Sequence, residues 1–169
     1  MAVSLLHAYA NPEHERRCAA RIRQRLPATT LTTSSEVLPE FREYERFSTT
    51  ALNAYVAPRM KRYLSLLRER LAVAGCPAPL SIMTSNGGSL PAERVQALPV
   101  LSMLSGPAAG VIAASHVGAS SGHPDVITCD MGGTSADVCL VRGGEYAMTT
   151  EGRVGGLPLK LRQIDINSI

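Results

Sequence analysis

The chain has 169 residues, of which 45% are hydrophobic and 4% aromatic, and its formal net charge is +3. This length suffices for one domain with a substantial core, or for parts of two domains. The high apolar content argues against disorder, and the few aromatic residues predict an aliphatic core. The positive charge is weaker than that of typical nucleic-acid-binding proteins, so we expect no nucleic-acid partner.

The opening segment MAVSLLHAYANPEHERR has no basic region ahead of its short apolar run, so it does not resemble a signal peptide. No apolar run approaches the roughly 18 residues that span a bilayer, and we expect no membrane association. The scattered cysteines Cys18, Cys76, Cys129 and Cys139 form no CxxC pair. They predict reduced, mostly structural thiols in a cytoplasmic protein.

Strand and helix patterns alternate at the start of the chain. Residues 2–10 predict a strand, and residues 12–26 predict a helix with Asn11 as its cap and Pro12 in its first turn. The acidic residues of the first helical turn suit the positive end of that helix. The threonine-rich residues 29–38 predict a second strand.

The longest helical pattern covers residues 44–74. Pro58 lies inside it and is expected to kink or split the helix. One apolar stripe at helical spacing is predicted to face the core. It consists of Leu52, Val56, Met60, Tyr63, Leu67 and Leu71.

Strands dominate the second half of the chain. Residues 79–88 predict a strand that runs into a tight turn, and residues 104–120 predict a loop and then a helix that starts near Pro107. Three consecutive strands follow, over residues 125–130, 135–142 and 145–154, and predict a β-meander. We therefore expect an α/β fold in two parts, with residues 1–104 ending one domain and residues 105–169 starting another.

The segment TCDMGGTSADVCLV, residues 128–141, carries the most informative motif. A strand that ends in Asp130 and turns through Gly132 and Gly133 exposes successive backbone N–H groups, which bind anions. The glycines let a phosphate approach closely, and the hydroxyls of Thr134 and Ser135 add donors. Two carboxylates, Asp130 and Asp137, are suitable ligands for Mg²⁺. The motif thus predicts a magnesium–phosphate site in which these two aspartates are the catalytic and metal-binding residues.

A second interpretation of the same segment stays open. It is equally typical of a β-hairpin turn in which the two aspartates only accept turn hydrogen bonds. The segment lacks the GK[ST] sequence of a Walker loop, and no helix follows it, which excludes a dinucleotide-binding fingerprint.

Two further turns offer backbone donors to a nucleotide. Asn86, Gly87 and Gly88 form a polar turn, although an ordinary Asn-Gly turn explains them nearly as well. Ser105 and Gly106 precede a helix whose first N–H groups suit an anion. Small residues there suit close helix packing equally well.

The remaining polar residues give weaker signals. His7 and His14 lie across a strand-to-helix turn and lack a third partner, so a capping or surface role is favoured over a metal site. We assign no role to His116 or His123. Five arginines between Arg16 and Arg25 predict a solvated helix face rather than an RNA site, because no aromatic residues are interleaved with them.

Beyond these local signals, DMGGTSADV resembles the phosphate-binding hairpin of the actin-like ATPase superfamily. More narrowly, it is similar to the ATP-dependent hydantoinase/5-oxoprolinase family. Four other stretches resemble that family in the same order, and the resemblance covers nearly the whole chain. They are LLHAYANPEHE, SSEVLPEFREYERFSTTALNAYVAPRMKRYL, IMTSNGG and LSGPAAGV.

The resemblance implies an actin-like (RNase H-like) fold that binds ATP and Mg²⁺. It implies an enzyme that couples ATP hydrolysis to opening of a cyclic amide such as a lactam or hydantoin, by phosphorylating the amide oxygen. A second hydantoinase subunit is the implied partner. Family members are longer, carry an earlier Asp-Gly-Gly-Thr hairpin and continue into a glycine-rich segment. We therefore expect an internal fragment with no turnover in isolation.

Other functions stay open at this point. A related ketone carboxylase and a sugar-kinase-like phosphotransferase would use the same fold. A non-catalytic actin-like fragment belongs to a different functional class. A metal-dependent nuclease on an RNase H-like fold is least favoured, because only two well-placed acids are visible.

Overall fold

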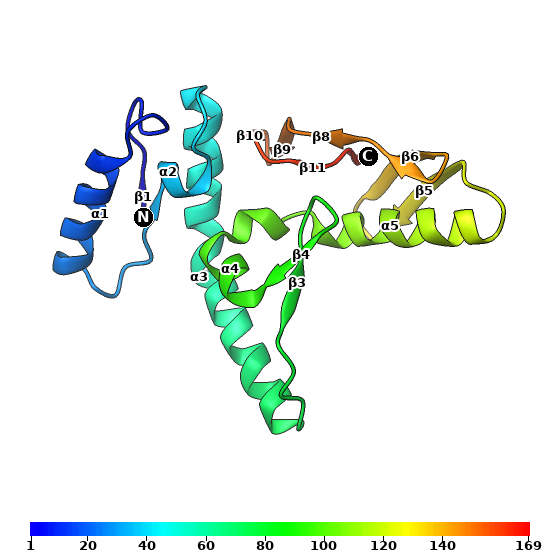
Figure 1. Cartoon of the computed structure of the whole chain (residues 1–169), viewed down its shortest axis with the longest axis horizontal. Coiled ribbons are helices and arrows are strands. Elements are labelled where there is room, and N and C mark those ends of the chain that lie inside the picture. The colour runs from blue at the N-terminus through cyan, green and yellow to red at the C-terminus, as the bar shows by residue number, and fades with distance from the viewer. The chain divides into compact units, whose positions relative to one another are not determined.

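The computed structural model describes residues 1–169 and divides into two compact units (Figure 1). The first unit consists of residues 1–80, 91–100 and 151–160, and the second of residues 81–90, 101–150 and 161–169. The expected division between residues 104 and 105 differs from this arrangement. Residues 81–90 fold with the second unit and residues 151–160 with the first, so the chain passes between the units several times. That the two units are actin-like domains stays a prediction.

The first unit is mainly helical. Its first two strands, β1 (Ala2–Val3) and β2 (Thr32–Thr33), pair in parallel. Its elements in chain order are β1 (Ala2–Val3), α1 (Glu13–Arg25), β2 (Thr32–Thr33), α2 (Ser34–Val37), α3 (Glu43–Val73), α4 (Ala92–Ala97), β9 (Gly152–Val154) and β10 (Leu157–Leu159). A 3-10 helix, Pro99–Ser102, lies at the point where the chain leaves this unit.

Both strands predicted in this unit are shorter than expected. The first ends at Val3, and the second is followed directly by α2. The buried carboxylate of Glu15 explains this change of direction. It accepts hydrogen bonds from the Leu5 N–H at 2.8 Å, the Ser34 hydroxyl at 2.5 Å and the Ser35 N–H at 2.8 Å. Glu15 was expected only to favour the helix N-terminus, but it holds the ends of both short strands.

The long helix α3 runs from Glu43 to Val73 and is not split at Pro58. Proline removes one helical hydrogen bond, but the packing of a 31-residue helix outweighs that loss. The predicted apolar stripe is only partly correct. Leu52 is buried, whereas Tyr63 is 58% exposed and Leu64 is fully buried in its place.

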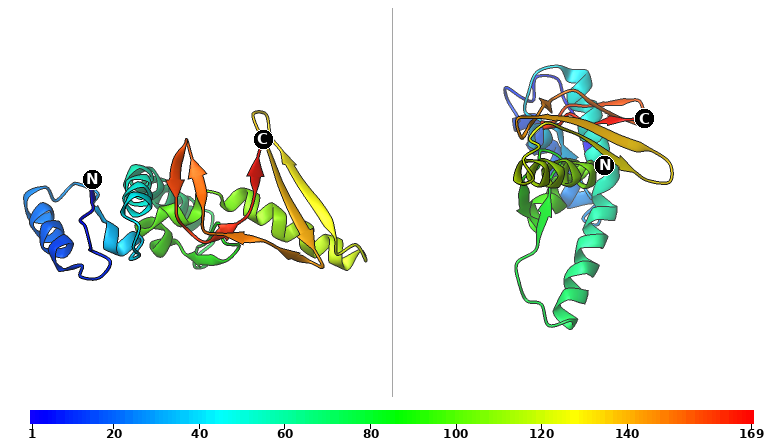
Figure 2. Two further views of the ribbon diagram at one scale, coloured as in Figure 1. Left: turned by 90° about the horizontal axis from the view of Figure 1, so that it is seen from above. Right: turned by 90° about the vertical axis from the view of Figure 1, so that its right-hand side faces the viewer.

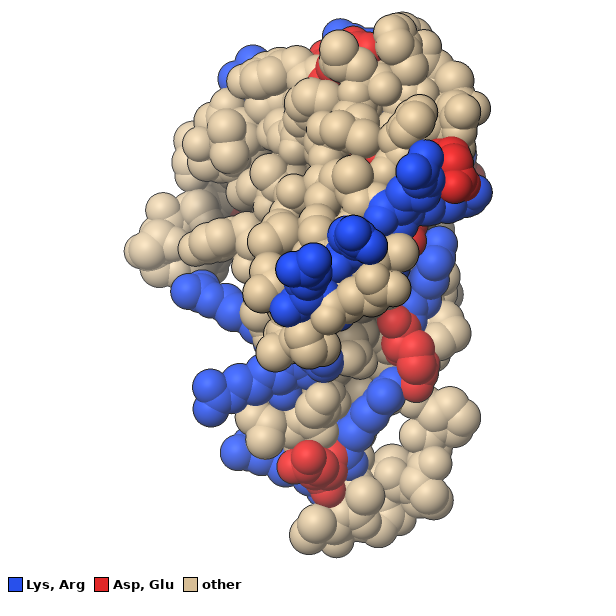
Figure 3. Space-filling model, turned by 90° about the vertical axis from the view of Figure 1, so that its left-hand side faces the viewer, with Lys and Arg blue, Asp and Glu red and all other residues tan.

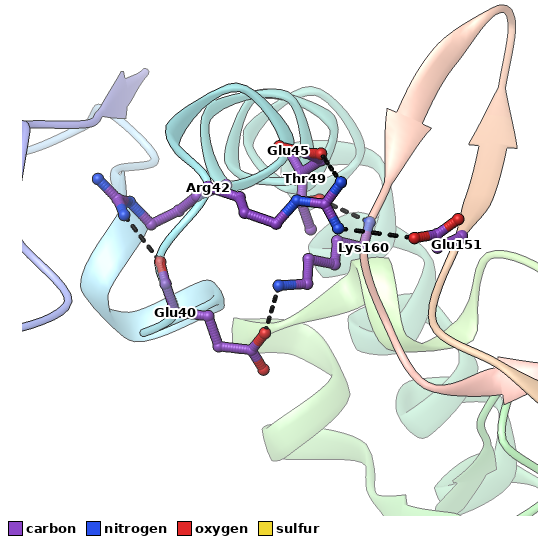
Figure 4. Close-up of polar contacts among 7 residues, drawn as sticks. Glu40, Arg42, Glu45, Thr49, Glu151 and Lys160 are labelled. Atoms are coloured by element: carbon purple, nitrogen blue, oxygen red, sulfur yellow. Dashed lines mark hydrogen bonds and ion pairs between the residues drawn. The ribbon is translucent and has the colours of Figure 1, made fainter.

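Residues 151–160 join the first unit through polar contacts with the start of α3 (Figure 4). The Lys160 ammonium lies 2.7 Å from a Glu40 carboxylate oxygen, and the Lys160 N–H donates to the Thr49 hydroxyl at 3.0 Å. Arg42 pairs with Glu45 at 2.9 Å and with Glu151 at 3.5 Å. These contacts explain why a segment distant in sequence lies with α3.

Helix α1 was predicted to present a solvated basic face, and this is confirmed. All five of its arginines are exposed, and Lys and Arg side chains spread over the face of the molecule seen in Figure 3. The predicted capping contact is present, since the Asn11 side-chain oxygen accepts a hydrogen bond from the Glu13 N–H at 3.1 Å. The helix begins one residue later than expected, however, at Glu13, and Pro12 occupies the N-cap position.

The second unit combines one helix with a small antiparallel sheet. Its main sheet has the order β12–β6–β5, with β7 also paired to β6. Its elements are β3 (Ser81–Met83), β4 (Ser89–Pro91), α5 (Ser105–Ser120), β5 (Val126–Met131), β6 (Ala136–Arg142), β7 (Glu145–Tyr146), β8 (Met148–Thr149), β11 (Gln163–Ile164) and β12 (Asn167–Ser168). β4 ends at the boundary with the first unit.

The predicted meander is confirmed for its first two strands and their Gly-Gly turn. Gly143 and Gly144 have φ values of 59° and 81°, which suit the tight turn between β6 and β7. The third strand, expected over residues 145–154, is instead divided into β7, β8 and β9. Only β7 pairs with β6, whereas β8 pairs with β11 and β9 with β10.

Helix α5 covers one face of the sheet and starts at Ser105, two residues before the predicted Pro107. Ala108 and Val111 of α5 form the core with Cys139 and Val141 of β6. The core is aliphatic, as the composition predicted.

No helix has the combination of length and apolarity that crossing a membrane requires. All four cysteines are free, but only Cys139 is buried. The expectation of mostly structural thiols is therefore wrong for Cys18, Cys76 and Cys129, which are exposed.

Candidate functional site

The β5–β6 hairpin brings the two predicted aspartates together. In the antiparallel register, Asp130 is directly opposite Asp137. Side chains at opposed positions project from the same face of a sheet. This face is the one that carries Cys139 and Val141 toward α5. Two like charges at opposed positions repel one another, so a bound cation would stabilise this pair.

A cavity lies beside the aspartate pair. It measures about 520 Å³ and is lined by both aspartates, by Pro107 and Gly110 of α5, and by Thr128 and neighbouring apolar residues. A side chain at position 110 would place its Cβ 4.0 Å from a carboxylate oxygen of Asp130. Glycine at this position therefore keeps the space between α5 and Asp130 open.

The glycine corner at the tip of the hairpin is exposed and has free donors. The Gly132 N–H donates to the Ser135 carbonyl at 3.0 Å, which closes the turn. The amides of Gly133, Thr134 and Ser135 donate no hydrogen bond within the chain. Neither glycine has a φ in the left-handed region, and added Cβ atoms would meet nothing closer than 3.8 Å. Packing within this chain therefore does not explain why both positions are glycine.

Asp137 has one partner within the chain. The hydroxyl of Ser168 in β12 donates a short hydrogen bond to its Oδ1 atom, and the two residues are opposed in the β12–β6 register. This contact orients Asp137 and leaves its second oxygen for another ligand. Sequence reasoning missed both Ser168 and Gly110, because neither position has a motif of its own.

The donor set fits Mg²⁺. No group of three or more His, Cys, Asp or Glu side chains is placed to hold a metal, so the protein offers two carboxylates. Mg²⁺ in phosphate sites commonly binds one or two carboxylates and fills its other positions with water and phosphate oxygens. Asp130 and Asp137 would hold the ion, and the ion would neutralise phosphate charge.

The predicted turn at residues 86–88 already uses most of its polar groups. The Gly87 N–H bonds the Thr84 carbonyl at 2.9 Å, and the Gly88 N–H bonds the Asn86 side-chain oxygen at 3.0 Å. Gly87 has φ +84°, and a Cβ there would lie 2.7 Å from Ile112. These contacts account for the turn structurally. Nucleotide binding by Asn86, Gly87 and Gly88 stays a prediction that would involve the exposed Asn86 amide.

Ser105 and Gly106 lie in the first turn of α5. The first N–H groups of a helix have no partner within the helix, and Gly106 is exposed with open space around it. The adjoining Pro107 lines the same cavity as Asp130 and Asp137. Ser105 and Gly106 themselves do not line that cavity, so anion binding by these two residues stays a prediction.

The two histidines of the first unit do not form a metal site. His7 and His14 are exposed, and no group of three metal-ligating side chains includes them. His7 lies in a turn with φ 57° and contacts the Tyr9 ring.

Comparison with known proteins identifies the family. Residues 46–169 match the model of the hydantoinase/oxoprolinase family, which is more than half of the chain. The chain belongs to the hydantoinase/oxoprolinase family. This confirms the resemblance on which the sequence interpretation relied.

Relatives in this family act on different substrates. The chain is 39% identical over 144 residues to caprolactamase subunit alpha of Pseudomonas jessenii, covering 85% of the chain and 21% of that protein. It is 31% identical to 5-oxoprolinase of Saccharomyces cerevisiae, covering all of the chain and 13% of that protein. It is 28% identical to the acetone carboxylase beta subunit of Xanthobacter autotrophicus, covering all of the chain and 24% of that protein. The chain spans about a quarter or less of the length of these relatives.

Two solved structures share this hydantoinase/oxoprolinase fold. The ATP-dependent caprolactamase of Pseudomonas jessenii superposes with a TM-score of 0.85 at 34% identity, over all of the chain and 25% of that structure. Nucleotide-free acetone carboxylase superposes with a TM-score of 0.86 at 28% identity, over 99% of the chain and 24% of that structure. The fold is therefore the mixed α/β fold of these ATP-dependent enzymes.

Proposed function

We propose that this chain supplies the magnesium–phosphate site of an ATP-dependent enzyme that opens a cyclic amide, either a lactam or a hydantoin. The observation that carries this proposal is the Asp130–Asp137 pair. It lines an open cavity near a glycine corner with three free amides. Family membership and the caprolactamase and 5-oxoprolinase relatives support the choice of substrate class.

The chemistry explains the need for ATP. An unstrained amide is a poor electrophile, and transfer of the γ-phosphoryl group from ATP to the amide oxygen activates its carbon. Water then adds to that carbon, the C–N bond breaks with protonation of nitrogen, and an acyl phosphate remains. A second water converts it to a carboxylate and inorganic phosphate. Bound Mg²⁺ would supply charge neutralisation at the phosphates.

The residues of this chain would act by position and charge. The free amides of Gly133, Thr134 and Ser135 would donate hydrogen bonds to phosphate oxygens. These bonds would stabilise the negative charge that develops during phosphoryl transfer. The first turn of α5, with Ser105 and Gly106, would add N–H donors next to Pro107, which lines the cavity.

The decisive experiment is calorimetric titration of Mg·ATP into the full-length polypeptide that carries these residues. We expect Asp130→Asn to weaken binding about tenfold or more, equivalent to roughly 1.4 kcal/mol. Asp165→Asn is the matched control, because Asp165 is an exposed acid of the same unit that does not line the cavity. Equal affinities of wild type and Asp130→Asn would overturn the proposal.

Ketone carboxylation is the second candidate, because acetone carboxylase superposes as well as caprolactamase does. A substrate screen with the full-length protein would separate the two activities. ATP-dependent conversion of lactams or hydantoins to amino acids or carbamoyl amino acids supports our proposal. Formation of a carboxylated ketone favours the second candidate, and a phosphorylated sugar would favour a kinase.

Three further features belong to this proposal. We assign the two units to an actin-like ATPase arrangement, which the family resemblance implies. We infer a second subunit as partner, because relatives include caprolactamase subunit alpha and the acetone carboxylase beta subunit. We also place the protein in the cytoplasm, in agreement with its four free cysteines.

A further inference from the structure

The first unit contains a cavity of its own. It measures about 370 Å³ and is lined by residues of α1, β2, α2, α3 and α4 and by their neighbours in the chain. All of these residues belong to the first unit, and none of them lines the cavity beside Asp130 and Asp137. In the view from above, α2 lies between α1 and α3 (Figure 2). The volume falls within the range of about 300–1,000 Å³ that is typical of small-molecule sites.

Charged side chains of both signs line this cavity without pairing. They are Arg23 of α1, Glu36 of α2 and Arg94 of α4. None of these three side chains makes a hydrogen bond or an ion pair within the chain, although other charged side chains of the unit do pair. Opposite charges that line one cavity and do not meet leave space between them for a ligand that carries both signs.

Thr32 adds a buried polar group to the lining of the cavity. It is 5% exposed, and its hydroxyl oxygen accepts a hydrogen bond from Asn53 Nδ2 at 3.3 Å. Asn53 is fully buried, donates also to the Ala97 carbonyl at 3.4 Å and accepts from the Val100 N–H at 3.2 Å. The hydroxyl hydrogen of Thr32 donates to no group of the chain. Because buried polar groups are normally hydrogen-bonded, an acceptor on a ligand would complete the bonding of Thr32.

The two signs of charge decide the class of ligand. A simple carboxylate would suit Arg23 and Arg94, because guanidinium groups bind carboxylates through paired hydrogen bonds, but it would leave Glu36 without a partner. A simple amine would suit Glu36, but the two arginines would repel it. A molecule with one carboxylate and one ammonium group satisfies all three side chains. Apolar lining residues, among them Leu31 and Val37, would contact its carbon chain.

We propose that this cavity binds an amino acid, with its carboxylate at Arg23 and Arg94 and its ammonium group at Glu36. The Thr32 hydroxyl donates to the same carboxylate. A second cavity of about 350 Å³ adjoins the first, since four residues line both, and it gives room for a linear chain of several carbon atoms. The site does not depend on the proposed function, although the opening of a lactam yields a molecule of this class.

Calorimetric titration of the full-length polypeptide without nucleotide tests the proposal. The probes are 4-aminobutanoate and 6-aminohexanoate, and hexanoate and hexylamine are the matched compounds that lack one of the two charges. We expect at least one amino acid to bind at least about tenfold more tightly than either matched compound, because each charge-assisted contact contributes that much. Arg23→Gln and Glu36→Gln should each weaken this binding by about tenfold. Arg16→Gln, at an exposed position of α1 that does not line the cavity, is the control and should bind like wild type.

Four results would overturn the proposal. The first is that neither amino acid binds, and the second is that hexanoate or hexylamine binds as tightly as 6-aminohexanoate. The third is equal affinity of wild type and Arg23→Gln, which would place the bound amino acid elsewhere. The fourth is an equal loss in Arg16→Gln, which would reflect the charge of the helix in general. Asp130→Asn should retain the binding, so failure of the magnesium–phosphate site and failure of this site are separate outcomes.

Discussion

Glu15 and Arg46 bind the two polar backbone groups of one residue, Leu5. The Glu15 carboxylate accepts the Leu5 N–H at 2.8 Å, and the Arg46 guanidinium donates to the Leu5 carbonyl at 2.9 Å. Both charged side chains are fully buried. Burial of ions is costly unless hydrogen bonds compensate for the lost water. Each of the two buried charges therefore needs its hydrogen bond to Leu5, and together they fix the position of the turn after β1.

Replacement of Glu15 by Gln is expected to lower the free energy of unfolding by about 1–3 kcal/mol. Gln cannot accept with both terminal atoms, so at least one of the donors from Leu5, Ser34 and Ser35 would lose its partner. Urea unfolding measures the change. Glu13→Gln, in the same helical turn but exposed, should stay within about 0.5 kcal/mol of wild type. Similar losses in both variants would contradict the assigned role.

The difference in stability between wild type and Glu15→Gln is expected to depend on pH. Burial raises the pKa of Glu15, but its hydrogen bonds with Ser34, Ser35 and Leu5 outweigh that effect and hold the pKa below the ordinary value of 4.5. A carboxyl whose pKa is lower in the folded chain stabilises the fold while it is ionised. The advantage of wild type over Glu15→Gln should thus be complete above pH 4.5 and decline as the pH falls further. A constant difference at acidic pH would refute this.

Replacement of Arg46 by lysine is expected to destabilise the fold even though the positive charge is kept. Its guanidinium donates to the carbonyls of Leu5 and Glu40 and lies over the rings of Tyr9 and Phe47. Arg46→Lys keeps the charge but cannot reproduce this planar fork. We expect Arg46→Lys to lower the free energy of unfolding, measured in urea, by roughly 2–3 kcal/mol.

Arg62→Lys, at an exposed position of the same helix, is the control for Arg46→Lys. Because Glu15 and Arg46 share Leu5, the double variant should lose less than the sum of the single losses, by at least about 0.5 kcal/mol. Strict additivity would mean that the two side chains act separately.

The predicted elements that the structure confirms are those specified by local patterns. Helix α1 follows from its cap and periodicity, and the β5–β6 hairpin follows from alternating residues around a glycine corner. The residues of helix α2 were predicted to form a strand. They form a helix instead because Ser34 and Ser35 bond to Glu15, about 20 residues earlier in the chain. No local propensity contains that contact.

The candidate site divides in the same way. Asp130 and Asp137 lie on one hairpin, so their spacing alone indicated that they meet. Ser168 and Gly110 come from β12 and α5, and only the folded arrangement shows their proximity to these aspartates. The buried face of α3 was misjudged because tertiary packing, rather than the apolar stripe, decides that Leu64 is buried and Tyr63 is exposed.

The aspartate pair should cost stability when no cation is present. We expect Asp130→Asn to raise the midpoint of thermal unfolding in the presence of EDTA, because it removes repulsion with the opposed Asp137. The free energy of unfolding should rise by about 0.5–1 kcal/mol. Added Mg²⁺ should stabilise wild type in proportion to its occupancy and leave Asp130→Asn unchanged. A destabilised Asp130→Asn in EDTA would indicate that the carboxylate serves the fold instead.

Ser168 is expected to act through Asp137. Ser168→Ala removes the hydroxyl that orients the Asp137 carboxylate. We expect the Mg²⁺ concentration for half-maximal thermal stabilisation to rise severalfold, while Ser168→Thr, which retains a hydroxyl, stays close to wild type. Ser102 is unsuitable as a control because of its own contacts, whereas Ser120→Ala at the end of α5 offers a distant exposed serine. An unchanged Mg²⁺ midpoint in Ser168→Ala would exclude the positioning role.

Two glycines of α5 provide a final test, because the same substitution should have opposite effects. Alanine is a better helix former than glycine by roughly 1 kcal/mol. At Gly110 an added Cβ would lie 4.0 Å from Asp130, an ordinary contact, so Gly110→Ala should stabilise the chain by about 0.5–1 kcal/mol. At Gly118 the Cβ would lie 2.7 Å from the His123 carbonyl, so Gly118→Ala should destabilise it by about 1–3 kcal/mol.

Larger residues at position 110 extend this test to the site. Gly110→Leu keeps the gain in helix propensity but fills the cavity beside Asp130. Full-length Gly110→Leu should therefore remain folded and lose affinity for Mg·ATP, as measured by calorimetry. Gly110 has no positive φ and no close contact that would require glycine for the fold. Retained affinity of Gly110→Leu for Mg·ATP would therefore mean that glycine at this position is not needed for ligand binding either.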